Sequence, residues 1–412
     1  MLTRRVFLRG SAVAMAGMGA VPSWLARAAA VEGKKRKTLV VIFQRGAADG
    51  LNIVIPFSEK RYRELRPTLA IAPPTGQTAG LTPAPNNATI DLDGQFALNG
   101  AMQPLKALWE KQQLAIVEAT GSPDPSRSHF DAQDYMESGT PGKPSGDGWL
   151  NRALPPADAE TSPLRAVALG NQVPHTLRGQ RDVIAVNNSQ QYQMGNRDAA
   201  EILQEMYSTS GDAQVGHTGK EAFEAMKMIQ SITQAPNNGP GGAQYGQGGD
   251  LGRNLQQLAR MIKADVGVEA AFAEIGGWDH HGNENQQLST LLRQFSNALA
   301  AFSQDMGDRM EDIVLVTMSE FGRTAQENGN AGTDHGHGSL MMVLGGPVRG
   351  GKVYGQWPGL EKEQLFEGRD LAVTTDFRAV LSELIRGHLG QKDLGPVFPG
   401  YKPSDPLGLL RS

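Results

Sequence analysis

The sequence predicts an α/β protein whose parallel or mixed sheet is covered by helices on both faces. Residues 39–43 form a continuous apolar run of β-prone side chains, as expected of a strand that is buried on both faces. Similar runs alternate along the chain with segments of helical periodicity, which is the usual pattern of such a sheet. The 50 glycines exceed the usual share of about 7% and favour a loop-rich α/β protein over a bundle of long helices.

The expected elements follow from these patterns in chain order. The first half is predicted to contain the strand 39–43, an exposed loop rich in Pro, Thr, Asn and Gly at 73–95, a helix at 102–111, a strand at 114–117, a loop at 120–127, a helix at 129–138, strands at 165–169 and 182–186, and helices at 198–207 and 220–232. The second half is predicted to contain a low-complexity loop at 236–249, a helix at 251–264, a strand at 268–275, a helix at 288–306 with one apolar stripe, strands at 313–316 and 340–344, and a helix at 376–388.

Composition excludes several classes of protein. With 412 residues, 39% hydrophobic and 20% charged, the chain is neither a membrane bundle nor a collagen nor mostly disordered. The net charge of −4 becomes more negative once the N-terminal arginines are set aside, so we expect no nucleic-acid partner. There is no Cys, so any metal must be bound by His and carboxylates.

The N-terminus has the pattern of an export signal. Arg4 and Arg5 precede a mildly apolar run at 12–21 and an Ala-rich segment at 25–30, which is typical of a twin-arginine signal peptide. The apolar run is shorter than the roughly 20 residues that span a membrane, so no stable membrane anchor is expected. We expect the twin-arginine translocase to export the chain, residues 1–30 to be removed, and the mature protein to be periplasmic or secreted.

Polar side chains follow several of the predicted strands. Open α/β sheets place their sites in the loops at the carboxyl ends of parallel strands, so these side chains are candidates for one site. They are Asp49, Ser128, His129, Asp279, His280, His281, Glu320, Asp334, His335 and His337.

Two short motifs favour a metal site. Asp279 and His281 are two residues apart, so in extended backbone both side chains point to one side and can bind one ion. Asp334, His335 and His337 repeat this arrangement between glycines that let the backbone approach a small centre. The alternative for each motif is ordinary hydrogen-bonded loop packing.

Four further candidates have simple alternatives. Asp49 precedes a glycine and could bind a metal or form a plain turn. Arg323 could bind an anionic group or form a surface ion pair. Ser128, beside Arg127, lies at a predicted helix start where backbone N–H groups favour an anion or an ionised oxygen, so it could be a nucleophile or only the helix N-cap.

Five segments together resemble an exported bacterial family, the domain of unknown function 1501. They are residues 39–51 (LVVIFQRGAADGL), 127–134 (RSHFDAQD), 276–281 (GGWDHH), 319–324 (SEFGRT) and 333–338 (TDHGHG). The resemblance spans about residues 37–390 and leaves 391–412 as a C-terminal tail. The family looks like a distant branch of the alkaline phosphatase and sulfatase superfamily. That resemblance implies a three-layer sandwich with a mostly parallel central sheet, and hydrolysis or transfer of phosphate or sulfate esters at one or two metal ions.

The resemblance also implies roles for single residues. Asp49 falls at the first metal-binding acid of the superfamily, and Ser128 falls near its nucleophile at a helix start. Asp279 and His281 resemble its Asp/His metal pair, although the superfamily spaces this pair more widely. His335 resembles the late metal histidine.

The chain departs from the superfamily at residues 320–322, which are Glu-Phe-Gly where a typical member has Asp-His-Gly. Glu320 can still bind an oxygen-loving ion, Phe321 cannot bind any, and His337 could replace the missing imidazole. Three interpretations remain: a two-metal esterase with altered ligands, a one-metal hydrolase, and a scaffold that has lost catalysis.

We favour a metal-dependent hydrolase of phosphate or sulfate esters, acting on an anionic small molecule or polymer. Zn, Mn or Fe, as one or two ions, would lower the pKa of water or of the Ser128 hydroxyl, and Arg127 or Arg323 would balance charge on the ester oxygens. The alternative is a non-catalytic periplasmic protein that serves binding or assembly on the same scaffold.

Overall fold

The computed structural model describes residues 36–74, 89–143, 145–158, 161–187, 213–233 and 242–411. The predicted signal peptide at 1–30 and the predicted helix at 198–207 lie outside these residues. Most of the predicted loop at 73–95 and the first part of the loop at 236–249 also lie outside them.

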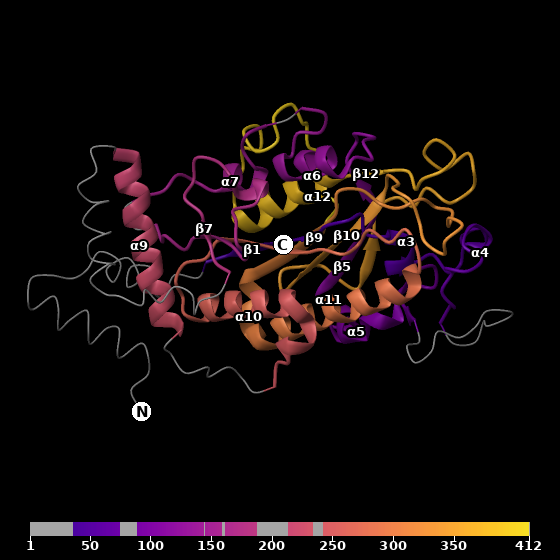
Figure 1. Ribbon diagram of the computed structural model, residues 1–412, viewed down its shortest axis with the longest axis horizontal. Helices are drawn as coiled ribbons and strands as arrows, with labels where there is room; N and C mark the ends of the chain where they lie inside the picture. Colours follow the sequence, from indigo (N-terminus) through magenta and orange to yellow (C-terminus); the bar gives the residue numbers. More distant parts are fainter. Residues whose placement is uncertain are drawn as a thin grey trace, which may run out of the picture.

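A nine-stranded sheet forms the centre of the described protein (Figure 1). The strands lie side by side in the order β11 (Lys352–Tyr354), β5 (Leu114–Gly121), β10 (Ser339–Gly345), β9 (Ile313–Met318), β1 (Thr38–Gln44), β8 (Ala270–Ile275), β6 (Ala166–Ala168) and β7 (Ile184–Ala185), and β12 (Thr375–Asp376) pairs with β5. All neighbours are parallel except at β10, which runs antiparallel to β5 and β9. The mostly parallel central sheet is therefore confirmed.

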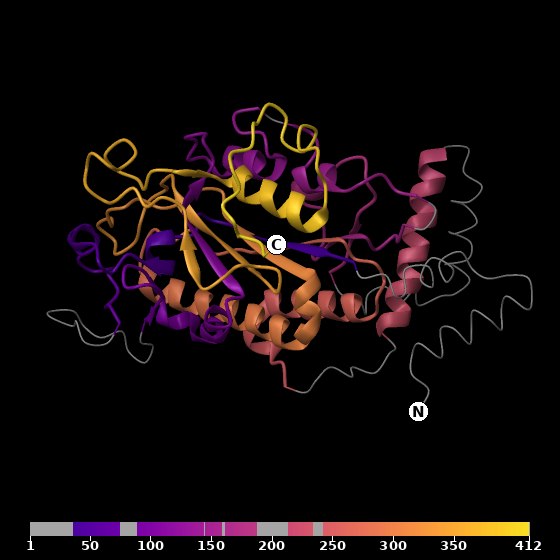
Figure 2. The same cartoon turned by 180° about the vertical axis from the view of Figure 1, so that it is seen from behind.

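Helices cover both faces of this sheet, which confirms the three-layer arrangement. Figures 1 and 2 show α5 (Lys106–Glu110), α10 (Gly249–Lys263) and α11 (Glu284–Met306) on one face, and α6 (His129–Ser138), α7 (Trp149–Ala153) and α12 (Phe377–Leu384) on the other. The remaining helices are α3 (Gly50–Ile53), α4 (Lys60–Leu65), α9 (Ala213–Thr233), the 3-10 helices η1 (Gly100–Leu105), η2 (His175–Leu177), η3 (Tyr245–Gly248) and η4 (Gly307–Asp312), and the π-helix η5 (Ile385–Leu389). No described helix is both long and apolar enough to cross a membrane.

Successive side chains of β1 belong to two different cores. Val40 and Ile42 pack in the core beneath α10 and α11, whereas Leu39, Val41 and Phe43 pack in the core beneath α12. Neighbouring side chains of a strand point to opposite faces, so a strand that is covered twice must be apolar at every position. This is why the strand appears in the sequence as an unbroken apolar run.

Some expected boundaries differ from the structure. The predicted helix 102–111 begins instead as the 3-10 helix η1 and becomes α-helical only in α5. Pro104 lies inside η1 and lacks the backbone N–H that an α-helical hydrogen bond requires. β5 continues through Gly121 into the predicted loop, because it pairs there with β12. A small second sheet of β2 (Val54–Ile55), β4 (Ala97–Leu98) and β3 (Ile90–Asp91) was not predicted, since two-residue strands show no periodicity.

The C-terminal segment packs against the body of the protein. Val397, Phe398 and Leu409 are fully buried in the core beneath α12. The Glu383 carboxylate in α12 accepts hydrogen bonds from four successive backbone N–H groups at 407–410. Residues 391–411 therefore complete one of the helical layers.

Candidate metal centre

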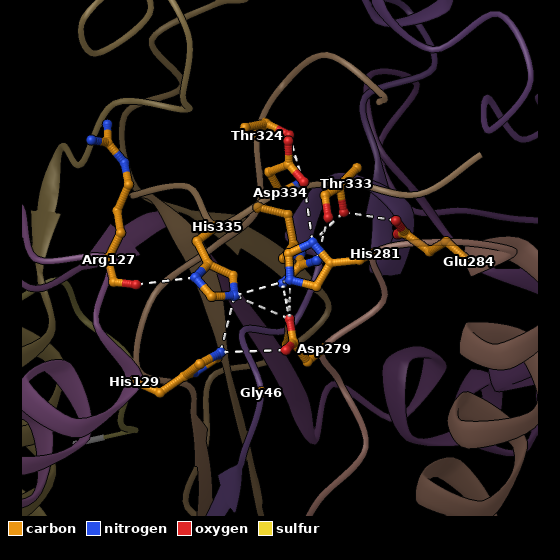
Figure 3. Close-up of polar contacts among 12 residues, drawn as sticks. Gly46, Arg127, His129, Asp279, His281, Glu284, Thr324, Thr333, Asp334 and His335 are labelled. Atoms are coloured by element: carbon orange, nitrogen blue, oxygen red, sulfur yellow. Dashed lines mark hydrogen bonds and ion pairs between the residues drawn. The ribbon is translucent and has the colours of Figure 1, made fainter. Parts of the chain in front are cut away.

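The candidate residues gather at one edge of the sheet. β1, β5, β8 and β9 all run in the same direction, so their carboxyl ends lie together, and the antiparallel strand β10 begins at that edge. The loops after β5 and β8 and the loop before β10 therefore meet, although they are far apart in the sequence. Figure 3 shows the side chains that these loops bring together.

Three histidines and one aspartate direct their ligand atoms toward one another (Figure 3). His335 Nε2 lies 3.1 Å from His129 Nε2 and 3.2 Å from His281 Nε2. Asp279 Oδ1 lies 3.1 Å from His335 Nε2 and 2.9 Å from His281 Nε2. The other oxygen of this carboxylate, Oδ2, lies 3.6 Å from His129 Nε2. We call these four residues the metal centre.

A hydrogen bond on the opposite nitrogen orients each of the three imidazoles. In each case Nδ1 contacts an oxygen that can only accept a hydrogen bond, and the tautomer with its proton on Nδ1 satisfies this contact and leaves the Nε2 lone pair for a cation. The pairs are His129 with Glu320 Oε1 at 2.8 Å, His281 with Asp334 Oδ1 at 3.1 Å, and His335 with the Arg127 carbonyl oxygen at 3.0 Å.

Glu320 supports His129 and does not itself face the metal centre. Its Oε1 also accepts hydrogen bonds from Gln133 Nε2 at 2.8 Å and from the Gly46 backbone N–H at 2.9 Å. Burial would raise the pKa of Glu320, but the hydrogen bonds from His129 and Gln133 outweigh it and lower the pKa. Glu320 is therefore an ionised carboxylate that holds an imidazole.

Arg323 neutralises the aspartate of the metal centre. Its side chain is fully buried and donates from Nη1 to Asp279 Oδ1 at 2.6 Å, and it also hydrogen-bonds to Thr333. Burial would raise the pKa of Asp279, but the hydrogen bond and the charge of Arg323 lower it. Arg323 is thus a buried cation that pairs with a partly exposed aspartate, and its contacts are with the protein itself.

The pKa values of two histidines move in opposite directions. The hydrogen bond to Glu320 raises the pKa of His129. Burial, together with the charge of neighbouring His129, lowers the pKa of His335. His335 is therefore neutral at pH 7, which is the state that can bind a metal through Nε2.

Asp49 is paired with its own cation. Both of its oxygens accept from the Arg66 guanidinium, at 2.5 and 2.9 Å, and both side chains are almost completely buried. Arg66 also donates to Asn52 and to the carbonyl oxygens of Thr324 and Ala325. The structure therefore places Asp49 in an internal ion pair.

The candidate nucleophile lies beside the metal centre and caps α6. Ser128 directly precedes His129, and its Oγ accepts a long hydrogen bond of 3.4 Å from the Asp131 backbone N–H. This contact leaves the hydroxyl proton of Ser128 available to another acceptor. Phe130, the next residue after His129, is 90% exposed and is the only large apolar side chain so exposed among the described residues.

Two further candidates face away from the metal centre. Arg127 donates from Nη2 to Asp370 at 2.6 Å and to Glu367 at 2.7 Å, so its guanidinium is paired with acids. His337 is buried and stacks on the Phe366 ring, with ring centroids 4.3 Å apart. His337 therefore does not take the place of the imidazole that is missing at position 321.

His129 is the ligand that was absent from the expected set. The expected ligands came from the motifs around Asp279 and His335, whereas His129 belongs to the segment that was considered for its serine. The signal in the sequence was that His129 follows the predicted strand 114–117, whose loop reaches the same edge of the sheet. Gly46 makes this crowding possible: it has a φ of +120°, and a Cβ there would lie 2.7 Å from the Asp279 backbone nitrogen.

Three of the ligand atoms fit one divalent ion. Those of His129, Asp279 and His335 all lie within 4.8 Å of one another, and His281 Nε2 lies beside two of them. A tetrahedral ion with bonds of about 2.0–2.1 Å would place neighbouring ligand atoms roughly 3.3 Å apart, close to the separations of His335 Nε2 from the other ligand atoms. Imidazole nitrogens beside a carboxylate form a donor set that suits Zn, Mn or Fe.

Comparisons with known proteins place the chain in a family. No curated protein is similar enough to count as a match. The structure is similar to the crystal structure of a protein in the alkaline phosphatase superfamily from Vibrio parahaemolyticus, with 12% sequence identity and a TM-score of 0.27. The match covers 76% of this chain and 61% of that chain. Residues 36–393 match the model of a family described as "Protein of unknown function (DUF1501)", and the chain belongs to this family.

Proposed function

We propose that this protein is a hydrolase of phosphate or sulfate esters that uses one divalent metal ion, bound by His129, His281, His335 and Asp279. The observation that carries the proposal is the convergence of three Nε2 lone pairs on one carboxylate. The similarity of the sequence motifs to those of phosphatases and sulfatases supports ester hydrolysis as the reaction.

One ion is favoured over two because the other acids are already engaged. Asp49 is neutralised by Arg66, whose guanidinium contacts both carboxylate oxygens. Glu320 holds His129 and Gln133. A second cation beside either acid would have to displace buried hydrogen bonds, which is costly.

The exposed side of the metal centre is the side from which a substrate can approach. The side chains of Asp279 and His281 are 43% and 47% exposed, whereas those of His129 and His335 are about a quarter exposed. A bound ion would polarise the ester and offset the charge that develops on its oxygens. Because Arg127 and Arg323 are paired with acids, neither guanidinium is free for this purpose.

Ser128 remains the proposed nucleophile. It lies next to His129 at the start of α6, where the backbone N–H groups and the helix dipole favour an ionised oxygen. Its hydroxyl proton would pass to a neighbouring base during attack on the ester, so the role depends on the metal centre.

Metal analysis and an activity screen test this proposal together. Natively purified protein should contain about one Zn, Mn or Fe per chain and should hydrolyse a member of a panel of phosphate and sulfate esters. Chelation should abolish turnover, and addition of the same metal should restore it. Metal-loaded protein that hydrolyses no ester in a broad panel would contradict the proposal.

A specific observation favours the alternative of a non-catalytic binding or assembly protein. Four protein ligands can fill a tetrahedral zinc site completely, as in structural sites, and leave no position for a substrate. In that case the metal would stabilise the fold and the ester screen would be negative, while metal content would still be about one ion per chain.

We also propose export by the twin-arginine route, with interaction of the chain with the translocase before cleavage. The residues concerned lie outside the described part of the chain, so the proposal depends on the Arg4–Arg5 pattern alone. Changing Arg4→Lys and Arg5→Lys together should leave uncleaved protein in the cytoplasm. Normal delivery of this double variant to the periplasm would rule out the route.

A further inference from the structure

A polar cavity of about 820 Å³ lies between the sheet and two helices. Leu169 and Gly170, which follow β6, and Gly276, which follows β8, line it on the sheet side. Residues of α10 and α11 form the other wall. Gly276 precedes Asp279 by three residues, so the two Cα atoms are at most about 11 Å apart. The cavity wall and the metal centre are therefore joined by a short stretch of chain.

One face of α10 supplies most of the helical wall. Asp250, Arg253, Asn254, Gln257 and Arg260 recur at intervals of three or four residues, which places them on one side of the helix. The opposite side of α10 is apolar and buried in the core; it includes Leu255, Leu258 and Met261. The polar stripe of α10 thus borders the cavity.

Neutral amides dominate the lining. Each primary amide offers both donors and an acceptor, which matches a hydroxyl group, since a hydroxyl also donates and accepts. Asn254 is held by a hydrogen bond of 3.3 Å from its Nδ2 to the Leu169 carbonyl oxygen. The amides are Asn171, Asn187, Asn254, Gln256, Gln257 and Gln294.

The charged groups of the cavity balance one another. Asp250 pairs with Arg253, and Glu274 pairs with Arg45 at 2.6 Å. The Nε–H of Arg260 is buried and has no hydrogen-bond partner within the described residues, so it is a donor that a ligand oxygen can satisfy. With two acids, two arginines and six neutral amides, the lining favours a polar ligand over an apolar one.

We infer that this cavity binds a neutral saccharide, namely the sugar portion of the ester whose phosphate or sulfate group reaches the metal centre. The connection between the sugar and an ester group at the metal centre rests on the proposed function. Binding of the sugar itself needs neither the metal nor turnover. Hydroxyl groups along the sugar would pair with the amides of α10 and α11 and with the Nε–H of Arg260.

Gly170 allows the cavity to be filled without backbone strain. A Cβ on Gly170 would meet nothing within 4 Å, and Gly170 does not have a positive φ. Gly170→Leu should therefore fold normally and occupy the cavity. Gly146 is equally open but lies far along the chain from the lining residues, so Gly146→Leu is the matched control. On α11, Gln294→Leu removes a lining amide, and Gln304→Leu changes an exposed amide outside the cavity.

Calorimetric titration of the full chain with neutral hexasaccharides of α-glucan, β-glucan, mannan, galactan and chitin tests the inference. At least one should bind, with affinity at least 10-fold weaker in Gly170→Leu and in Gln294→Leu, and within twofold of wild type in the two control variants. Binding should persist in His335→Ala, which separates this result from failure of the ester screen. Absence of binding to every hexasaccharide, or equal binding by all variants, would overturn the inference. Displacement of the bound sugar by inorganic phosphate or sulfate would show an anion site and would overturn it as well.

Discussion

Glu320 Oε1 accepts the Nδ1–H of His129 at 2.8 Å, and this contact turns Nε2 of His129 toward His335. The same Glu-Phe-Gly segment that departs from the phosphatase pattern therefore contributes to the metal centre indirectly. Phe321 packs against the rings of His129 and His335, with centroids 5.0 and 5.1 Å away. The imidazole that is missing at position 321 is matched by an imidazole that enters from the loop after β5.

The first prediction concerns this hydrogen bond. Glu320→Gln keeps the shape of the side chain but removes its charge, so the His129 imidazole becomes less basic and less well oriented. Loss of such a partner typically lowers metal affinity by about 10–100-fold. Competition with a chelator of known affinity would measure the change for Zn. Glu367→Gln, at an exposed carboxylate that pairs with Arg127, is the control and should bind Zn as wild type does.

The second prediction separates two histidines of one loop. His335→Ala removes a ligand, so the stabilisation that added Zn gives to the wild type should disappear. At a metal concentration of 100 times Kd this stabilisation is about 2.7 kcal/mol, which a thermal melt with and without Zn can resolve. His337→Ala should keep the stabilisation, because His337 stacks on Phe366 away from the metal centre. Equal responses of the two variants would show that the ligand set is wrong.

Much of the fold could be predicted because its strands are buried twice. The unbroken apolar runs at 39–43 and 313–316 are typical of a parallel strand that is covered on both faces. In the structure they lie in β1 and β9, respectively. β2 and β3 could not be predicted, because two residues carry no period. The π-helical end at η5 also leaves no mark in the sequence.

The candidate site was predictable only in part. Asp279 and His335 could be expected to meet, since both loops reach the same edge of the sheet. The pairing of Asp49 with Arg66 could not, because Arg66 ends the short helix α4, which no motif indicates. The support of His129 by Glu320 joins residues 191 positions apart and depends on tertiary packing alone.

The third prediction concerns the buried pair of Arg66 and Asp49. Arg66→Met leaves the Asp49 carboxylate buried without a partner, which should lower the free energy of unfolding by about 3–5 kcal/mol. Adding Asp49→Asn should recover part of that loss, because the uncompensated charge is then removed. Denaturant unfolding of the single and double variants gives both values. Lys60→Met, in an exposed pair on α4, should change stability little. Additive losses in the double variant would contradict the pairing.

The fourth prediction tests whether Ser128 is a nucleophile or only an N-cap. Ser128→Ala should abolish ester turnover while metal content stays at the wild-type level, and the lost cap should cost about 0.5–2 kcal/mol of stability. Ser126→Ala removes a neighbouring hydroxyl that accepts only from the Ser128 backbone N–H, and it should retain turnover. Full activity of Ser128→Ala would leave the serine as a helix cap.

The last prediction is a pH dependence that originates at Glu284. This fully buried carboxyl accepts from Thr333 Oγ1 at 2.7 Å, and burial together with the Asp49 charge raises its pKa to about 9. An unfolded glutamate releases its proton near pH 4.3, so between roughly pH 4.3 and 9 the folded state binds more protons than the unfolded state. The contribution of Glu284 to the free energy of unfolding is therefore greatest at low pH and falls as the pH rises through that window.

Glu284→Gln keeps a group that can accept from Thr333 and donate toward Asp49, but it has no proton to lose. The free energy of unfolding of Glu284→Gln should therefore rise relative to wild type from pH 5 to pH 9, as measured by denaturant titration at each pH. Glu363→Gln, at an exposed position, controls for the loss of one carboxylate and should follow the wild-type profile. If the stability profile of Glu284→Gln instead runs parallel to that of wild type across this range, then Glu284 is ionised in the folded protein, and the charge of Arg66 offsets its repulsion from Asp49.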